Sequence, residues 1–358
     1  MIQPDERLLS LLDYAKEHGA SDLHLSVGTV PRIRVRNELL CVEGQDKLLP
    51  DDTKRMIYSV MEEKERAVFE ENGEADFAFG IEGKGRYRAN AYRQRNTCCC
   101  ALRLMSGKIQ NPEELGIPDA VMELSKMRSG LVLVTGPTGC GKSTTLAAII
   151  QAINETRHCH VITLEDPIEY LYHHDQAIVD QREIGVDSKS FSGALRAALR
   201  EDPDVLLVGE MRDLDTISTA ITAAETGHLV FSTLHTLNAA TTVDRIIDVF
   251  PDAQQAQIRT QLASVLEAVI SQRLIPAAQG TRRVAVFEIL RANSAIRNLI
   301  RTGRSNMIAG QLAQGQREGM NTLDQALADA CRAGRITQES AMLFAEDLDA
   351  MKRNLGIR

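Results

Sequence analysis

The feature that most restricts the fold is a glycine-rich segment at residues 136–143, which reads Gly-Pro-Thr-Gly-Cys-Gly-Lys-Ser. It follows an apolar run at 131–135 that is typical of a buried strand, and it opens onto a helical pattern at 143–156. A Gly-x4-Gly-Lys-Ser segment between a strand and a helix is the pattern of a phosphate-binding loop, whose glycines let backbone N–H groups surround an anion. We therefore expect a nucleotide site formed by Gly136, Pro137, Thr138, Gly139, Cys140, Gly141, Lys142, Ser143 and Thr144.

Beyond this loop, apolar runs alternate with helix-length segments. The expected strands are 131–135, 160–164, 205–208 and 229–233, and the expected helices are 143–156, 191–201 and 214–226. Near-continuous apolar strands separated by helices predict an α/β fold with a parallel sheet covered on both faces. The remainder reads as mostly helical, over 239–274 and from 294 onward, with one strand at 283–290.

The N-terminal part of the chain has a different pattern. One helix is expected at 7–18, and short strands at 22–26, 32–36, 76–80, 86–92 and 98–104. A polar stretch with two glycines and two prolines follows at 106–118 and has the composition of a linker. We therefore predict a small α+β domain at 1–105, a linker at 106–118 and an α/β domain at 119–358.

Two acidic residues stand at the ends of apolar runs. Glu210 follows the run at 205–208, and Glu165 ends the run at 161–165. Hydrolysis of a bound nucleotide requires an acidic group at a neighbouring strand end, where it orients Mg²⁺ or the attacking water. Ser143, Glu165 and Glu210 are thus the candidate ligands of Mg²⁺, directly or through water. The sequence leaves open which glutamate is the principal base.

Three further residues are candidates for the same site. His228 and His235 lie on either side of the apolar run at 229–233, and His235 is the better candidate for a phosphate sensor because it follows the strand. Cys140 occupies a variable position of the glycine-rich segment, so we hypothesise that its alkylation blocks nucleotide binding and that ATP protects it.

Composition excludes several classes of protein. The chain has 358 residues with 41 Lys and Arg against 49 Asp and Glu, a net charge of −8, and only 4% aromatic residues. This acidic balance argues against a dedicated nucleic-acid-binding protein, so no nucleic-acid partner is expected. No apolar run approaches the ~20 residues of a membrane-spanning helix. We expect a cytoplasmic protein, and the seven cysteines without a Cys-x-x-Cys pair agree with a reducing compartment.

In their order along the chain, these motifs resemble the type II/type IV secretion ATPase superfamily, and most closely the PilT group of type IV pilus retraction ATPases. The resemblance covers nearly the whole chain. It is carried by the glycine-rich loop, the acidic segment 162–169, the segments 195–204 and 210–213, the histidine segment 227–235, and the stretches 19–25, 295–301 and 319–327. The stretch 295–301 resembles a motif linked to retraction, and the sequence lacks the tetracysteine loop of extension and secretion ATPases.

The resemblance implies a RecA-like ATPase core behind a PAS-like N-terminal domain. It also implies a homo-hexameric ring that uses ATP and Mg²⁺, closes its domains around nucleotide, and acts on an inner-membrane pilus platform protein. A paralogous retraction ATPase is a possible partner, and peripheral association with the inner membrane through the pilus machine follows.

Arginines supplied by another domain or subunit are expected to neutralise charge on the transferred phosphoryl group. Arg88 and Arg93 are our candidates, from a segment that also holds Arg86 and Arg95. By the two-residue period of a strand, Arg86 and Arg88 share one face and Arg93 and Arg95 the other. Arg196, Arg200 and Arg212 are the alternatives from the core domain.

Three other functions remain open at this point. The first is a pilus extension or secretion ATPase, or an accessory retraction subunit, of the same superfamily. The second is a RecA-like motor stimulated by nucleic acid, which the net charge disfavours. The third is a nucleotide-switched structural ring with negligible turnover.

Overall fold

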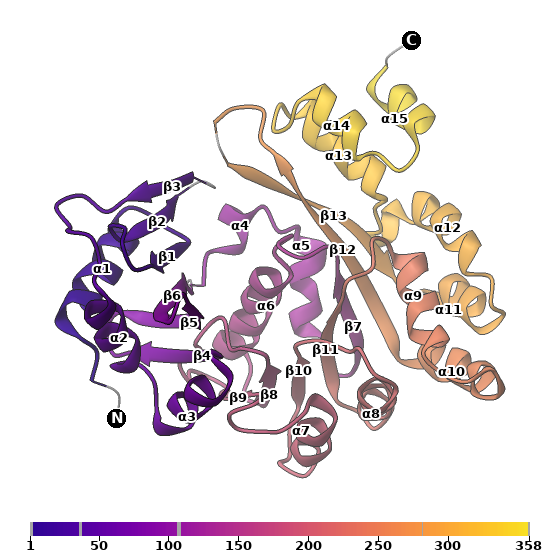
Figure 1. Cartoon of the computed structure of the whole chain (residues 1–358). Coiled ribbons are helices and arrows are strands. Elements are labelled where there is room, and N and C mark those ends of the chain that lie inside the picture. Colours follow the sequence, from indigo (N-terminus) through magenta and orange to yellow (C-terminus); the bar gives the residue numbers. More distant parts are fainter. Residues whose placement is uncertain (1–2, 36–37, 106–108, 281, 357–358) are drawn as a thin grey trace. The chain divides into compact units, whose positions relative to one another are not determined.

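The computed structural model describes residues 3–35, 38–105, 109–280 and 282–356. The chain forms two compact units, shown in indigo to purple and in magenta to yellow in Figure 1. The first comprises Met1–Lys108 with Glu169–Leu171, and the second comprises Ile109–Ile168 with Tyr172–Arg358. Part of the expected linker, 106–108, lies outside the described residues. Each unit is described by itself below.

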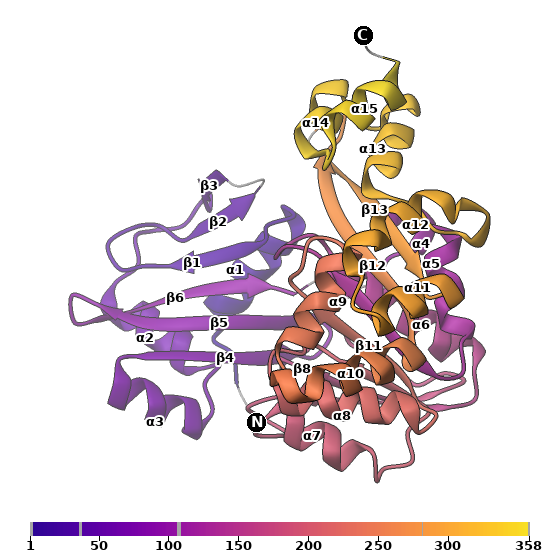
Figure 2. The ribbon, with the colours of Figure 1, turned by 90° about the vertical axis from the view of Figure 1, so that its right-hand side faces the viewer.

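The first unit is a six-stranded antiparallel sheet with helices on one face (Figure 2). Its strand order is β3-β2-β1-β6-β5-β4. The strands are β1 (Asp22–Leu25), β2 (Arg32–Val35), β3 (Glu38–Cys41), β4 (Glu74–Ile81), β5 (Gly85–Gln94) and β6 (Thr97–Leu104), and the helices are α1 (Glu6–Glu17), α2 (Pro50–Tyr58) and α3 (Glu63–Asn72).

Alternate strand residues build the core of this unit. Tyr87, Ala89 and Ala91 of β5 are buried and join a cluster that includes residues of α1, α2 and α3. The intervening residues of β5 lie on the other face, as the two-residue period of a strand requires. The predicted helix and five predicted strands of this unit are confirmed within about two residues, whereas β3, α2 and α3 were not predicted.

The second unit is built on a seven-stranded mixed sheet in the order β13-β12-β7-β11-β10-β8-β9. All neighbouring pairs are parallel except β12 with β13. The strands are β7 (Gly130–Thr135), β8 (His160–Glu165), β9 (Ile178–Glu183), β10 (Val205–Val208), β11 (Leu229–Leu234), β12 (Leu266–Pro276) and β13 (Arg283–Arg291).

Helices cover both faces of this sheet (Figure 1). Leu131 and Leu133 of β7 face a cluster that includes helices α7 (Phe191–Ala198), α8 (Leu214–Glu225), α9 (Ala239–Asp248) and α10 (Asp252–Val265). Val132 and Val134 face the other cluster, which includes α6 (Lys142–Thr156). The short helices α4 (Pro112–Leu115) and α5 (Asp119–Met122) and a 3-10 turn (Glu123–Lys126) precede β7. The expected α/β fold with a doubly covered parallel sheet is therefore confirmed.

One expectation about this unit is wrong. Residues 266–274 were expected to be helical, yet they belong to the 11-residue strand β12. β12 lies between β7 and β13 and is buried along most of its length. Pairing with two neighbours outweighs the helical pattern of the isolated segment, because strand formation depends on tertiary context more than on local preference.

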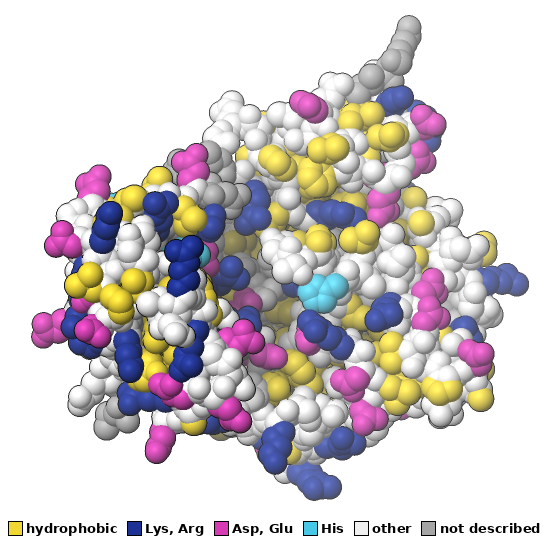
Figure 3. All heavy atoms as spheres, viewed as in Figure 1, with side chains coloured by type: hydrophobic (Ala, Val, Ile, Leu, Met, Phe, Trp, Pro, Cys, Tyr) yellow, Lys and Arg dark blue, Asp and Glu magenta, His cyan; other side chains and the backbone are white. Residues whose placement is uncertain are grey.

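The chain after β13 is helical, as expected. The helices are α11 (Ser294–Arg301), α12 (Ile308–Gln314), α13 (Leu323–Arg332), α14 (Gln338–Phe344) and α15 (Leu348–Leu355), with short 3-10 turns at Ser305–Met307 and Gln316–Glu318. Helices α13–α15 share a small core with Ile275 of β12 and Val286 of β13. Figure 3 shows hydrophobic side chains gathered over α13 and α14, and Leu343 is 76% exposed. Among the described residues, no helix combines the length and the apolar character needed to cross a bilayer.

A carboxylate is buried inside the second unit. Glu288 of β13 is 4% exposed, and burial raises its pKa from the ordinary 4.5 to about 7. This value is the net result of several effects. The nearby Glu346 also raises the pKa, while hydrogen bonds from the backbone of Ala239 and Leu323 and from Ser271 lower it. The folded chain therefore takes up this proton at a higher pH than the unfolded chain does.

We predict a pH-dependent effect of Glu288→Gln on stability. Between pH 4.5 and 7 the folded wild type holds more protons than the unfolded chain, so the Glu288 contribution to its stability falls as pH rises through this window. Relative to wild type, Glu288→Gln should thus gain about 3 kcal/mol from pH 4.5 to above 7, and then no more. Urea unfolding of both proteins from pH 5 to 8 measures the difference. A constant difference across this range would contradict the assignment.

Candidate functional site

Four predicted site segments meet at one edge of the second sheet. Because β7, β11, β10 and β8 are parallel and adjacent, their carboxyl ends point the same way. Thr135 at the end of β7 pairs with Leu234 of β11, and Val208 at the end of β10 pairs with Leu164 of β8. The glycine-rich loop, His235, Glu210 and Glu165 therefore all lie at this edge, which is where open α/β sheets bind ligands.

The glycine-rich loop packs closely on β12. A Cβ on Gly136 would stand 2.4 Å from the carbonyl oxygen of Gln272, and Gly136 has a φ of +142°. A Cβ on Gly141 would stand 2.9 Å from Gln272 Nε2, and its φ is +92°. Only glycine fits this combination of backbone conformation and space. The loop leads directly into α6, which begins at Lys142 immediately after Gly141.

Lys142 joins the loop to two other segments. Its Nζ donates to the carbonyl oxygens of Gly136, at 2.8 Å, and of Pro137, at 3.3 Å. The same Nζ lies 3.5 Å from His235 Nδ1, and His235 Nε2 lies 3.9 Å from Glu210 Oε2. Lys142, His235 and Glu210 therefore form a continuous polar row across the ends of β7, β11 and β10.

The charges in this row are set by its neighbours. Burial and then Lys142 lower the pKa of His235, with Arg212 acting in the same direction and Glu210 opposing it. His235 is accordingly a neutral imidazole at pH 7. Glu210 pairs with Arg212, whose Nη2 lies 2.8 Å from Glu210 Oε2.

Glu165 has a more enclosed set of partners at the end of β8. Its Oε1 accepts hydrogen bonds from Thr163 Oγ1, at 2.6 Å, and from Gln181 Nε2, at 3.1 Å. These contacts fix the carboxylate to β8 and β9. Gly209 brings the neighbouring strand close, because a Cβ there would lie 3.0 Å from the Leu164 carbonyl oxygen.

Ser143 and the two glutamates are compatible with Mg²⁺. Ser143 is exposed on the first turn of α6, and oxygen ligands suit this ion. Among the described residues, no group of three or more His, Cys, Asp or Glu could hold a metal ion.

The structure does not bring His228 to this edge. His228 immediately precedes β11, so the length of the strand, roughly 20 Å, separates it from His235. Its Nδ1 lies 2.9 Å from the carbonyl oxygen of Ala223 and 3.2 Å from Thr226 Oγ1, at the end of α8. Within one chain, His228 therefore lies away from the strand ends and its ring caps the end of α8, while its catalytic role stays a prediction.

The arginine candidates belong to the first unit and differ in their surroundings. Arg93 Nη2 lies 2.6 Å from Glu70 Oε2, and its guanidinium stands 5.5 Å from the centre of the Phe69 ring. Arg88 is exposed and lies on the opposite face of the sheet from Tyr87 and Ala89. Both side chains are exposed, and Arg93 is the one held by Glu70 and Phe69.

Sequence reasoning missed the contribution of β12. Gln272 is buried, accepts a hydrogen bond from Thr145 Oγ1 at 2.7 Å, and supports both Gly136 and Gly141. Ser271 accepts one from Thr135 Oγ1 at 3.2 Å. The polar pair Ser271-Gln272 within an otherwise apolar run is the signal that could have marked this strand as part of the site.

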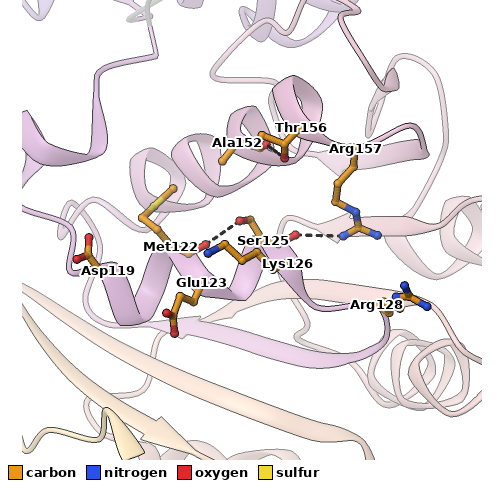
Figure 4. Close-up of a pocket in the computed structure, with 9 residues that line it drawn as sticks. All are labelled: Asp119, Met122, Glu123, Ser125, Lys126, Arg128, Ala152, Thr156 and Arg157. Carbon is orange, nitrogen blue, oxygen red and sulfur yellow. Dashed lines mark hydrogen bonds between the residues drawn. The ribbon is translucent and has the colours of Figure 1, made fainter.

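A separate cavity lies at the other end of α6 (Figure 4). It has a volume of about 740 Å³ and is lined by Asp119, Met122, Glu123, Ser125, Lys126, Arg128, Ala152, Thr156 and Arg157. Arg157 is held by the carbonyl oxygens of Ser125 and Met127. None of the predicted site residues lines this cavity, so the polar row at the strand ends remains the candidate site.

The packing of the loop leads to a prediction for Gly136→Ala. The added methyl group meets the Gln272 carbonyl and Cys140 Sγ, and the backbone conformation is strained, so the loop must move away from β12. We expect a stability loss of about 2 kcal/mol and at least tenfold weaker ADP binding, about 1.4 kcal/mol, by urea unfolding and calorimetry. Gly310→Ala in α12 is the control, because nothing lies within 4 Å of its Cβ position. Unchanged ADP affinity in Gly136→Ala would contradict this account.

The structure also changes the expectation for Cys140. Its side chain is buried at 3% exposure, and burial raises the pKa of the thiol. Because the thiolate is the reacting form, we now expect iodoacetamide to modify the exposed Cys41 of β3 well before Cys140 in the folded protein. Peptide mass spectrometry over a time course measures both. Equal rates for the two residues would show that the loop opens readily.

Comparisons with known proteins agree with this geometry. Residues 6–343 match the model of the family described as type II/IV secretion system protein. The chain is 46% identical over 337 residues to the type IV pilus retraction ATPase PilT of Pseudomonas aeruginosa, covering 93% of this chain and 96% of that protein. It is 38% identical over 347 residues to the type IV pilus ATPase PilU of the same organism, covering 97% and 90%.

A solved structure extends the agreement to three dimensions. The crystal structure of the pilus retraction motor PilT with bound ADP superposes with a TM-score of 0.90 at 48% identity, covering 96% of this chain and 98% of that one. The chain therefore belongs to the type II/IV secretion system protein family, within its group of type IV pilus retraction ATPases.

Proposed function

We propose that this protein is a hexameric ATP-hydrolysing motor that powers type IV pilus retraction. The observation that carries the proposal is the polar row of Lys142, His235 and Glu210 at the end of the glycine-rich loop, with separations of 3.5 and 3.9 Å. The named activity of the retraction relatives supports it.

In the proposed mechanism the loop binds the phosphates of ATP. Lys142, which donates to two loop carbonyls, turns its ammonium group to the β- and γ-phosphates when ATP binds. The amino end of α6 adds a positive dipole. Ser143 would hold Mg²⁺, which would supply positive charge beside the phosphates.

Hydrolysis is assigned to the acidic residues at the neighbouring strand ends. Glu210 orients the attacking water and accepts its proton, while Arg212 holds the Glu210 carboxylate in place. Neutral His235 offers a nitrogen between Lys142 and Glu210 and senses the γ-phosphate. Glu165, fixed by Thr163 and Gln181, would help hold Mg²⁺ through water.

Arginines from a neighbouring copy complete the site in this proposal. Both side chains are exposed, and Arg88 is the favoured donor because Arg93 must first give up its contact with Glu70. A guanidinium near the γ-phosphate stabilises the charge that develops as phosphoryl transfer proceeds. Each active site then forms only in the assembled ring, so hydrolysis depends on association.

Work on the pilus follows from nucleotide-dependent closure of the two units about segment 106–118. A ligand shifts such an equilibrium only through different affinities for the open and closed states, and the γ-phosphate supplies that difference. The inner-membrane platform protein of the pilus is the proposed recipient of the motion. A PilU-like paralogue is a proposed second partner, and the protein would then be cytoplasmic, held at the membrane by the pilus machine.

An extension or accessory role within the family is the nearest alternative, and the resemblance of 295–301 to a retraction motif argues against it. A motor driven by nucleic acid is disfavoured as well. On the face in Figure 3, Lys and Arg side chains are interspersed with Asp and Glu. The net charge of −8 likewise argues against attraction to a phosphate backbone.

The experiment that tests the proposal measures ATPase rate against protein concentration, with particle mass by light scattering. We expect the rate per chain to rise as six-fold particles form, because the site needs a second copy. Glu210→Gln should lose about a hundredfold or more in kcat while still binding ATP. Glu165→Gln should bind ATP with weaker Mg²⁺ dependence and a smaller loss.

The outcomes separate the alternatives. Full activity in a monomer would overturn the shared site, and equal mild losses in both glutamate variants would overturn the division of roles. A rate that rises with added DNA and falls steeply with salt would favour the nucleic-acid motor. ATP binding and assembly with no turnover in wild type would favour the structural ring.

A further inference from the structure

Glu288 is a buried carboxylate that lies between the amino ends of two helices. Its Oε1 accepts a hydrogen bond from the backbone N–H of Ala239, the first residue of α9, at 2.8 Å. The carboxylate also accepts one from the backbone of Leu323, the first residue of α13. The positive ends of both helix dipoles therefore face one negative group.

The same carboxylate is connected to the strand that carries the glycine-rich loop. Ser271 Oγ donates to Glu288 Oε1 at 3.3 Å, and Thr135 Oγ1 donates to Ser271 Oγ at 3.2 Å. Thr135 is the last residue of β7 and immediately precedes Gly136. Two hydroxyl groups thus link Glu288 to the start of the loop.

The contact with α9 reaches the other side of the site. Only residues 236–238 separate His235 from Ala239, and Asn238 caps the helix by accepting from the backbone of Thr241. Fixing Ala239 therefore fixes the end of the short segment that carries His235. This places Glu288 at a junction between the loop bearing Lys142 and the segment bearing His235.

Burying a charge in a protein core lowers the stability of the fold unless an opposite charge pairs with it. Glu288 accepts from neutral groups, the backbone of Ala239 and Leu323 and the hydroxyl of Ser271, and the nearby Glu346 carries a charge of the same sign. A buried charge without a counter-charge costs stability that a neutral side chain of equal size would not. Three donors surround Glu288, and a glutamine offers one acceptor oxygen and an NH2 donor where the carboxylate offers two acceptors, so Glu288→Gln loses at least one of these hydrogen bonds.

We propose that Glu288 is a positioning residue for ATP hydrolysis, which holds the His235 segment in register with the glycine-rich loop by joining the start of α9 to β7 through Ser271. Glu288 touches neither nucleotide nor metal and acts through Ala239. The proposal rests on the role given above to His235. It also makes Glu288 the point where α13, in the C-terminal helices, meets the nucleotide site.

The test is a double-mutant cycle on steady-state ATPase activity in the full-length protein. We measure kcat and KM for wild type, Glu288→Gln, His235→Ala and the double variant, and confirm folding by urea unfolding. Glu288→Gln should lower kcat about tenfold or more, with KM within about threefold of wild type. In the His235→Ala background the same change should alter kcat by less than about twofold, since the segment it positions no longer contributes.

Glu267→Gln is the matched control. Glu267 lies near the opposite end of β12 and pairs with Arg297 at 2.8 Å, so the same chemical change there should leave kcat unchanged. A merely structural role for Glu288 would alter stability and leave kcat per folded chain as it is. The expected result is instead a variant that is more stable at neutral pH and slower.

Three outcomes would overturn the proposal. An unchanged kcat in Glu288→Gln would show that Glu288 has no positioning role. A loss that adds in full to that of His235→Ala would show that Glu288 does not act through this segment. A wild-type kcat in His235→Ala alone would show that Glu288 cannot act through His235. The absence of ATPase activity in the assembled wild type would instead overturn the proposed function itself.

Discussion

The structure of the second unit depends on the close approach of the glycine-rich loop to β12. Gly136 and Gly141 lie against Gln272 with no room for a Cβ, and both have positive φ values, +142° and +92°. This approach requires β12 to pair with β7, and β12 in turn pairs with β13. The supporting side chains, Ser271, Gln272 and Glu288, all come from this hairpin, so the binding loop is held from one side by strands that follow it in the chain by more than a hundred residues.

Much of this architecture is predictable from local pattern. The loop, the strands that precede it and follow it, and the acidic residues at their ends are evident because parallel buried strands leave apolar runs and catalytic groups follow them directly. β12 escapes prediction because Glu267, Gln272 and Arg273 interrupt its apolar run. β9 and β3 escape for a related reason, since polar or short strands take their conformation from the neighbour with which they pair.

The roles of individual side chains are harder to predict than the elements that carry them. His228 and His235 look equivalent as two histidines on either side of one strand, yet the direction of a parallel strand places only His235 beside the loop. Arg88 and Arg93 likewise belong to one strand, but opposite faces and Glu70 separate their surroundings. Glu288 has no motif of its own, because its importance comes from two helix amino ends that meet in space and lie far apart in sequence.

The β12–β13 hairpin connects the nucleotide site with the core of the C-terminal helices. Near the loop it contributes Ser271, Gln272 and Glu288, and beyond them it contributes Ile275 and Val286 to the core of α13–α15. Sliding one strand of such a ladder by a single residue would turn each of its side chains to the opposite face. The register of the hairpin is therefore fixed, so a motion that passes along it between the C-terminal helices and the nucleotide site must be a change in its curvature or twist.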